Sequence, residues 1–169
     1  MLVANGFQID TAISKYYDIE VNEPNNPALC LKIGRISVLR RSLPIADLEL
    51  KKLQQNDPNY GLHILKAYIA AQQNNRADAD AELKAAQGGA RPWSDFWTSS
   101  AEIYAMFGDN KAVIAALQQV ADRGEPTVTY VLTHPLFAYL RNDADFLQVR
   151  AQLLSGREAM RAALAQIPM

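Results

Sequence analysis

The sequence contains a single cysteine, Cys30, and only two histidines among its 169 residues. One cysteine cannot form an intrachain disulfide, and such scarcity is typical of proteins from a reducing compartment. Cys30 lies in an apolar, packing context with no base beside it, so a catalytic nucleophile is not indicated. His63 and His134 are 71 residues apart and have no partners at ligand spacing. We therefore expect no metal site and no catalytic residues, and hence no enzyme.

Neither sign of charge is in excess, because 17 Lys and Arg residues face 18 Asp and Glu residues. Nucleic-acid-binding domains normally carry a basic surplus, so we expect this segment to bind no nucleic acid. No apolar run approaches the ~18–20 residues of a membrane span, and the first ten residues lack the pattern of a signal peptide. We expect a cytoplasmic protein without a membrane partner, or a periplasmic one if a membrane-anchored protein carries it. No GxxxxGK[S/T] phosphate loop occurs, and no cofactor is expected.

Small residues recur with a period of 33 or 34 residues. One series consists of Ala12, Ala46, Ala79 and Val113. Apolar residues follow each member at four and seven positions, a spacing that puts all three on one helix face. A second series, 12 residues upstream of the first, consists of Gly34, Ala67 and Ala101. Small residues at both places let paired helices approach closely, which predicts a chain of helical hairpins.

Capping residues and prolines place the helix boundaries. The spacing predicts helices over 10–22, 27–40, 43–56, 60–73, 76–87, 94–107 and 110–123. The residues expected at N-caps are Asp10, Ser42, Asn75, Ser94 and Asp109. Short helices are expected near 127–132 and 135–140, followed by a longer helix that Asn142 caps. A capping box of Ser155 and Glu158 predicts a separate last helix from Gly156 to Gln166.

This pattern resembles the tetratricopeptide repeat family over roughly residues 6–126. The best-matching unit contains Trp97, Ala101, Tyr104, Gly108 and Val113. The resemblance implies an all-α solenoid of helix-turn-helix repeats, a right-handed superhelix with a C-terminal helical cap. Its implied divisions are a partial first repeat with only its second helix (1–26), repeats at 27–59, 60–93 and 94–126, and capping helices at 127–169. An ordinary helical bundle with alanines at chance spacing is the alternative.

The tail after residue 126 is similar to the segment that closes many bacterial tetratricopeptide regions. The residues that carry this likeness are His134, Pro135, Leu136, Phe137, Leu140, Arg141, Asp143 and Phe146. The resemblance implies a scaffold or signalling module that binds a peptide or helical segment of a partner protein in its concave groove. The alternative is a regulatory or sensor domain of a larger bacterial transcription regulator, kinase or cyclase.

The resemblance also implies which residues line that groove. On the first helices of the three repeats they are Leu31, Arg35, Val38, Ile64, Tyr68, Ala71, Thr98, Glu102 and Ala105. Tyr68 is the expected aromatic anchor for a partner, but it could equally fill space under the neighbouring helix. Tyr16 and Ile19 lie on a helix without a preceding partner helix, so a homo-oligomer could form through that N-terminal end.

Overall fold

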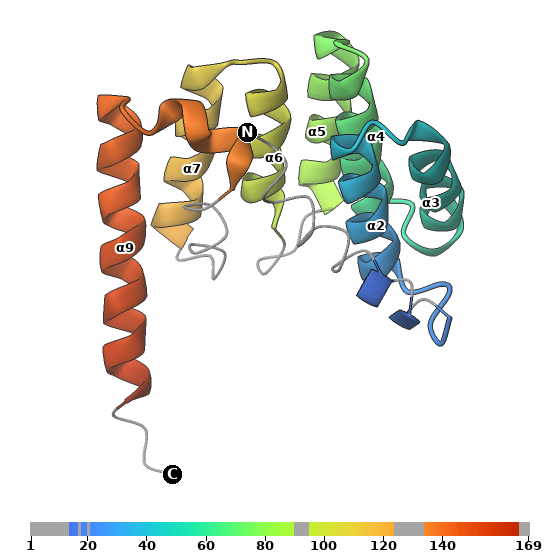
Figure 1. Ribbon diagram of the computed structural model, residues 1–169, viewed down its shortest axis with the longest axis horizontal. Helices are drawn as coiled ribbons and strands as arrows, with labels where there is room; N and C mark the ends of the chain where they lie inside the picture. Colours follow the sequence, from blue (N-terminus) through green and yellow to red (C-terminus); the bar gives the residue numbers. More distant parts are fainter. Residues whose placement is uncertain (1–13, 17, 20, 90–94, 124–133, 166–169) are drawn as a thin grey trace. The chain divides into compact units, whose positions relative to one another are not determined.

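The computed structural model describes residues 14–16, 18–19, 21–89, 95–123 and 134–165. All regular structure within these ranges is helical, and they contain no strand (Figure 1). The expected all-α class is therefore confirmed for the described part of the chain. The chain forms two compact units, Met1–Ala90 and Arg91–Met169.

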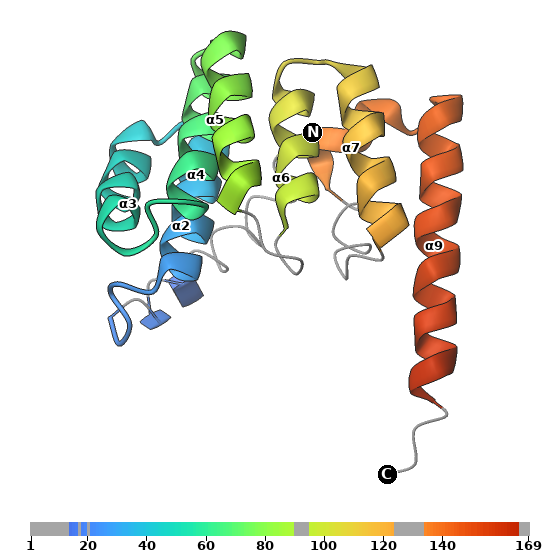
Figure 2. The same cartoon turned by 180° about the vertical axis from the view of Figure 1, so that it is seen from behind.

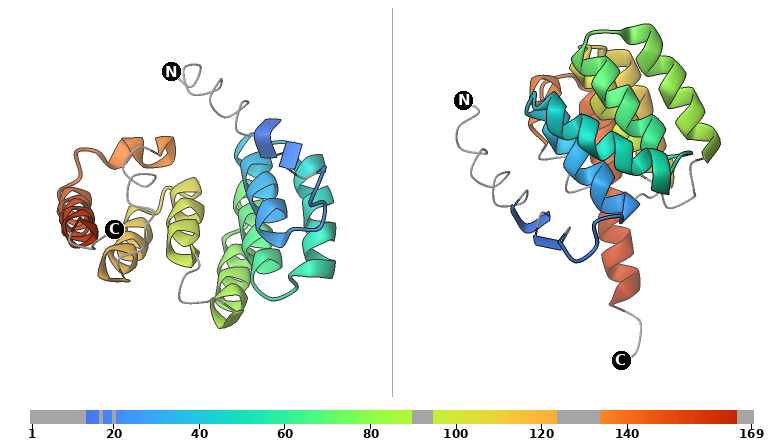
Figure 3. Two further views of the ribbon diagram at one scale, coloured as in Figure 1. Left: turned by 90° about the horizontal axis from the view of Figure 1, so that it is seen from below. Right: turned by 90° about the vertical axis from the view of Figure 1, so that its right-hand side faces the viewer.

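The first unit consists of two helical hairpins. Its helices are α2 (Pro27–Leu39), α3 (Leu43–Asn56), α4 (Gly61–Gln72) and α5 (Arg76–Gly89). Helix α2 pairs with α3, α4 pairs with α5, and both α2 and α3 pack against α4 (Figure 3). These bounds agree with the predicted ranges to within two residues. Of the first predicted helix, residues 14–16 and 18–19 are helical, whereas Val21 and Asn22 already form a turn.

The second unit contains one helical hairpin and two C-terminal helices. Its elements are α6 (Phe96–Met106), α7 (Asn110–Arg123), the 3-10 helix η1 (Pro135–Leu140) and α9 (Ala144–Leu164). Helix α6 packs on α7, η1 packs on α6, and α9 packs along α7 (Figure 2). The core of this unit includes Phe137 and Leu140 from η1 and Phe146 from α9.

The three hairpins turn through the same backbone conformation. The turn residues Arg41, Asn74 and Gly108 all have positive φ, at 61°, 57° and 70°. In the first hairpin the Ser42 N–H donates to the Ser37 carbonyl at 2.8 Å, and the Arg41 N–H donates to the Val38 carbonyl at 2.9 Å. The equivalent bonds are 2.9 and 3.0 Å in the second hairpin and 3.1 and 3.0 Å in the third. This pair of bonds around a left-handed residue is the Schellman motif, which satisfies carbonyls at the end of a helix.

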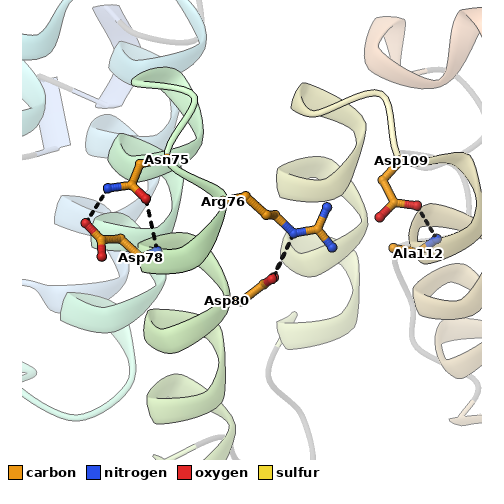
Figure 4. Close-up of polar contacts among 6 residues, drawn as sticks. All are labelled: Asn75, Arg76, Asp78, Asp80, Asp109 and Ala112. Atoms are coloured by element: carbon orange, nitrogen blue, oxygen red, sulfur yellow. Dashed lines mark hydrogen bonds and ion pairs between the residues drawn. The ribbon is translucent and has the colours of Figure 1, made fainter.

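The residue after each turn stands at the N-terminus of the next helix. Asn75 Oδ1 accepts from the Asp78 N–H at 3.2 Å, and Asp109 Oδ1 accepts from the Ala112 N–H at 3.0 Å (Figure 4). Both predicted caps are confirmed. Ser42 occupies the same place before α3, but its side chain makes no capping bond. The predicted caps Asp10 and Ser94 lie outside the described residues.

The small residues of both series lie at helix contacts. Ala46, Ala67, Ala79, Ala101 and Val113 are all 0% exposed. At Gly34 the approach is closest, because a Cβ there would lie 2.5 Å from Leu65 Cδ2 and 3.3 Å from Glu49 Cβ. Helix α2 can therefore reach α3 and α4 together only because this position has no side chain.

Two predictions for the tail are wrong. Helix α9 continues without a break from Ala144 to Leu164, so the proposed last helix does not start at Gly156. One helix-interior glycine costs only about 1 kcal/mol relative to alanine, too little to end a helix whose flanks favour helical structure. The cap of α9 is Asp143 rather than Asn142, since Asp143 Oδ1 accepts from the Asp145 and Phe146 N–H groups, each at 3.0 Å.

The other tail predictions divide between confirmed and untested. The helix expected near 135–140 is confirmed as η1, and His134 Nδ1 accepts from the Leu136 N–H at 3.2 Å to begin it. The short helix expected near 127–132 lies outside the described residues.

We expect Ala79→Leu to lower the free energy of unfolding by about 1–3 kcal/mol, because the added atoms would overpack the contact between α4 and α5. Ala46→Leu and Ala101→Leu should behave alike. Ala81→Leu, an exposed position on the same helix, is the matched control and should change stability by less than about 0.5 kcal/mol. Urea unfolding followed by circular dichroism measures the difference. Equal stability of Ala79→Leu and Ala81→Leu would show that the register is wrong.

We expect Arg41→Gly to stabilise the protein by about 0.5–1 kcal/mol. A left-handed conformation costs an ordinary residue ~1–2 kcal/mol, whereas the entropy cost of glycine is ~0.5–1 kcal/mol. Asn74→Gly should be close to neutral, because asparagine tolerates this conformation. Gly108→Ala should destabilise by about 1 kcal/mol. Thermal and urea unfolding of the three variants give the comparison, and a destabilised Arg41→Gly would contradict the shared turn.

Candidate partner-binding site

The structure places six of the nine predicted groove residues on two adjacent helices of the first unit. Leu31, Arg35 and Val38 lie on α2, and Ile64, Tyr68 and Ala71 lie on α4, which packs directly against α2. The remaining residues, Thr98, Glu102 and Ala105, lie on α6 in the second unit.

Arg35 and Tyr68 come together across the contact between α2 and α4. The guanidinium carbon of Arg35 lies 5.6 Å from the centroid of the Tyr68 ring. This distance is within the range of a cation–π interaction, which holds the guanidinium over the ring face. The two residues are 33 positions apart in the sequence, so the helical repeat is what makes them neighbours.

Eight of the nine predicted residues are buried, and only Arg35 is partly exposed. Tyr68 is 0% exposed, so the chain's own atoms cover its ring and hydroxyl group. A partner that touched Tyr68 would have to displace these atoms. The burial therefore agrees with the second interpretation of Tyr68, as a residue that fills space between helices. Its role as an anchor stays a prediction.

Sequence analysis missed a buried carboxylate beside this pair of helices. Glu49 on α3 is 1% exposed, and its Oε1 atom lies 2.8 Å from Lys52 Nζ. A buried carboxylate requires a compensating charge or hydrogen bonds, and Lys52 supplies one. The signal was present in the spacing, because Glu49 lies three residues after Ala46 and four before Leu53. The repeat pattern predicts Leu50 in this place, but Leu50 is only half-buried.

A second polar cluster joins α4 to α5. His63 Nδ1 lies 2.5 Å from Glu82 Oε2, and Lys66 Nζ lies 3.8 Å from Glu82 Oε1. The side chains of His63 and Glu82 are each about one quarter exposed. His63 thus links two helices instead of only packing. Within the described ranges, no group of three or more His, Cys, Asp or Glu side chains could hold a metal ion.

The N-terminal end of the first unit carries exposed apolar residues. Ile19 is 47% exposed and Val21 is 83% exposed. Tyr16 is half-buried, and the Lys32 ammonium group lies 5.9 Å from the centroid of its ring. Self-association through this end stays a prediction.

In the second unit, one tyrosine has a perturbed acidity. Partial burial raises the pKa of Tyr139 above 10.0, and the nearby carboxylate of Asp109 raises it further. About half of the side chain is nevertheless exposed, at 51%. Asp109 also caps α7, so η1 lies close to the turn between α6 and α7.

Comparisons with known proteins do not identify a relative. No protein-family model, curated protein or solved structure matches the sequence. The likeness to tetratricopeptide repeats therefore depends on the residues and hairpins described above. None of the helices in the described ranges is long and apolar enough to span a membrane.

We expect the stability of the protein to fall with increasing pH above about 10 partly through Tyr139. Its pKa is higher in the folded state than in the unfolded state, so its contribution is complete below pH 10 and is lost as pH rises through the folded pKa. Tyr139→Phe should remove this part of the alkaline loss, as measured by urea unfolding between pH 9 and 11.5.

Asp109→Asn tests the electrostatic cause separately, because asparagine still caps the helix but carries no charge. The variant should lower the pKa of Tyr139, as read from ultraviolet titration after subtraction of the same variant in a Tyr139→Phe background. An unchanged titration would contradict the influence of Asp109.

Proposed function

We propose that this protein is an interaction module built from tetratricopeptide-like repeats. It binds an extended or helical segment of a partner protein along the groove formed by the first helices of its hairpins. The observation that supports this proposal is the threefold recurrence of one helical hairpin, with the same left-handed turn residue at 41, 74 and 108. Equivalent hairpins that stack on one another extend a single surface, which is the property that repeat proteins use for binding.

The packing inside the first unit supports the stacked arrangement. Helices α2 and α4 are the first helices of consecutive hairpins, and they lie directly against each other. Each is apolar over most of its length, whereas α3 and α5 carry most of the charged residues. Stacking of this kind places successive first helices in one layer and successive second helices in another.

Arg35 gives the proposed groove its chemical preference. It is the most accessible of the nine residues, and the Tyr68 ring beneath it fixes the position of its guanidinium group. A guanidinium group binds a carboxylate through two parallel hydrogen bonds, which adds direction as well as affinity. The favoured partner is therefore an apolar segment that carries an acidic side chain opposite Arg35.

Selection from a displayed library of random peptides tests this function. We expect the wild-type protein to enrich peptides that combine apolar residues with Asp or Glu. Arg35→Glu should weaken their binding at least tenfold, equivalent to about 1.4 kcal/mol, because it replaces attraction by repulsion. Fluorescence polarisation with a labelled peptide measures the affinity.

Lys51→Glu is the matched control, since it makes the same charge change at an exposed position on α3. It should leave the affinity unchanged. Circular dichroism and urea unfolding must show that Arg35→Glu remains folded. Failure to enrich any peptide, or equal binding by wild type and Arg35→Glu, would contradict the proposed groove.

A further inference from the structure

Helix α9 has one half that packs within the second unit and one half that does not. Phe146, Val149 and Leu153 are 3–4% exposed and belong to the core that α7 shares. After Arg157, every position of α9 whose side chain is described is exposed. Figures 1 and 2 show the C-terminal half of α9 running past the end of α7. A helical segment shorter than about 12–15 residues is only marginally stable alone, so this half gains from a partner.

A second stripe of residues runs along α9 on a different face from its buried stripe. Its members are Leu147, Ala151, Leu154, Glu158, Arg161 and Ala165. Their alternating spacing of four and three residues is the heptad seam by which two helices pair. At 100° per residue, this seam lies roughly a third of a turn from the stripe that packs on α7. Leu147 is 43% exposed, and Leu154 is half-buried.

The two charged residues of the seam identify its partner. In a parallel pair of identical helices, Glu158 would face Glu158 and Arg161 would face Arg161, which is repulsive. In an antiparallel pair, Glu158 of each copy faces Arg161 of the other, and the same register places Leu154 opposite Ala165. Neither charged side chain has a hydrogen bond or ion pair with another described residue. The seam is thus complementary to itself in one orientation only.

We propose that the C-terminal half of α9 binds the same segment of a second copy of this chain in an antiparallel pair. The interface has two symmetric Glu158–Arg161 ion pairs flanked by contacts between Leu154 and Ala165. Exposed ion pairs contribute little, at ~0.2–1 kcal/mol each, and the contact is smaller than a standard interface. The dimer is therefore weak, with a dissociation constant of roughly 10–500 µM.

Sedimentation of the full chain at up to about 1 mM, in low salt, tests this pairing. Glu158→Arg and Arg161→Glu should each weaken dimerisation at least tenfold, because each creates two like-charge pairs. The double variant Glu158→Arg/Arg161→Glu restores both ion pairs with reversed polarity and should dimerise within about threefold of wild type. Lys84→Glu, an exposed charge reversal on α5, should have no effect.

Circular dichroism controls for the fold of each variant, and the exposed positions of both residues make unfolding unexpected. A monomeric wild type at about 1 mM would overturn the proposal. So would single reversals that dimerise normally, or a double variant that fails to recover. Ile19→Glu separates the two ends of the chain. Loss of the dimer in Ile19→Glu, with the α9 reversals unaffected, would assign self-association to the N-terminal end instead.

Discussion

Close approach of helices at small residues is the constraint on which this structure depends. Gly34 shows it most clearly, because Leu65 and Glu49 occupy the space that its side chain would need. Ala67 and Ala101 hold the equivalent place in the later hairpins and are fully buried. Two helices that approach this closely bury their facing sides almost completely. The charged residues are then left to the outer helices, and the first helices become the apolar layer of the first unit.

Periodicity predicted most of the fold because helical hairpins leave a direct record in the sequence. The triplet Ala79, Leu83 and Ala86, expected on one face of its helix, is the buried face of α5. The turn was harder to predict, because Arg41 and Asn74 replace the glycine typical of such turns. The backbone bonds of the Schellman motif fix the conformation even so, and the side chain tolerates it at a small energetic cost.

The candidate site could be located only in part. Spacing identified Arg35 and Tyr68 as residues on one helix face each, and the structure shows that they meet. Spacing cannot tell how far a neighbouring helix covers a stripe, so it could not foresee that Tyr68 is fully buried. Composition likewise hid Glu49, because a charged residue at a core position becomes acceptable only when a partner such as Lys52 is present. The missed continuity of α9 has a similar origin, since local capping signals at Ser155 competed with a helix that tertiary contacts had already started.

The unbroken course of α9 also has a mechanical consequence. From Leu153, its last fully packed residue, to Leu164, the helix extends by about 16 Å as one stiff rod. Force applied at the tip is transmitted along this lever to Phe146 and Val149 in the core of the second unit. A tilt of about 10° at the packed end moves the tip by about 3 Å. Binding at the end of α9 would therefore load the contact with α7 directly, and the packing around Phe146 sets how stiffly the lever is held.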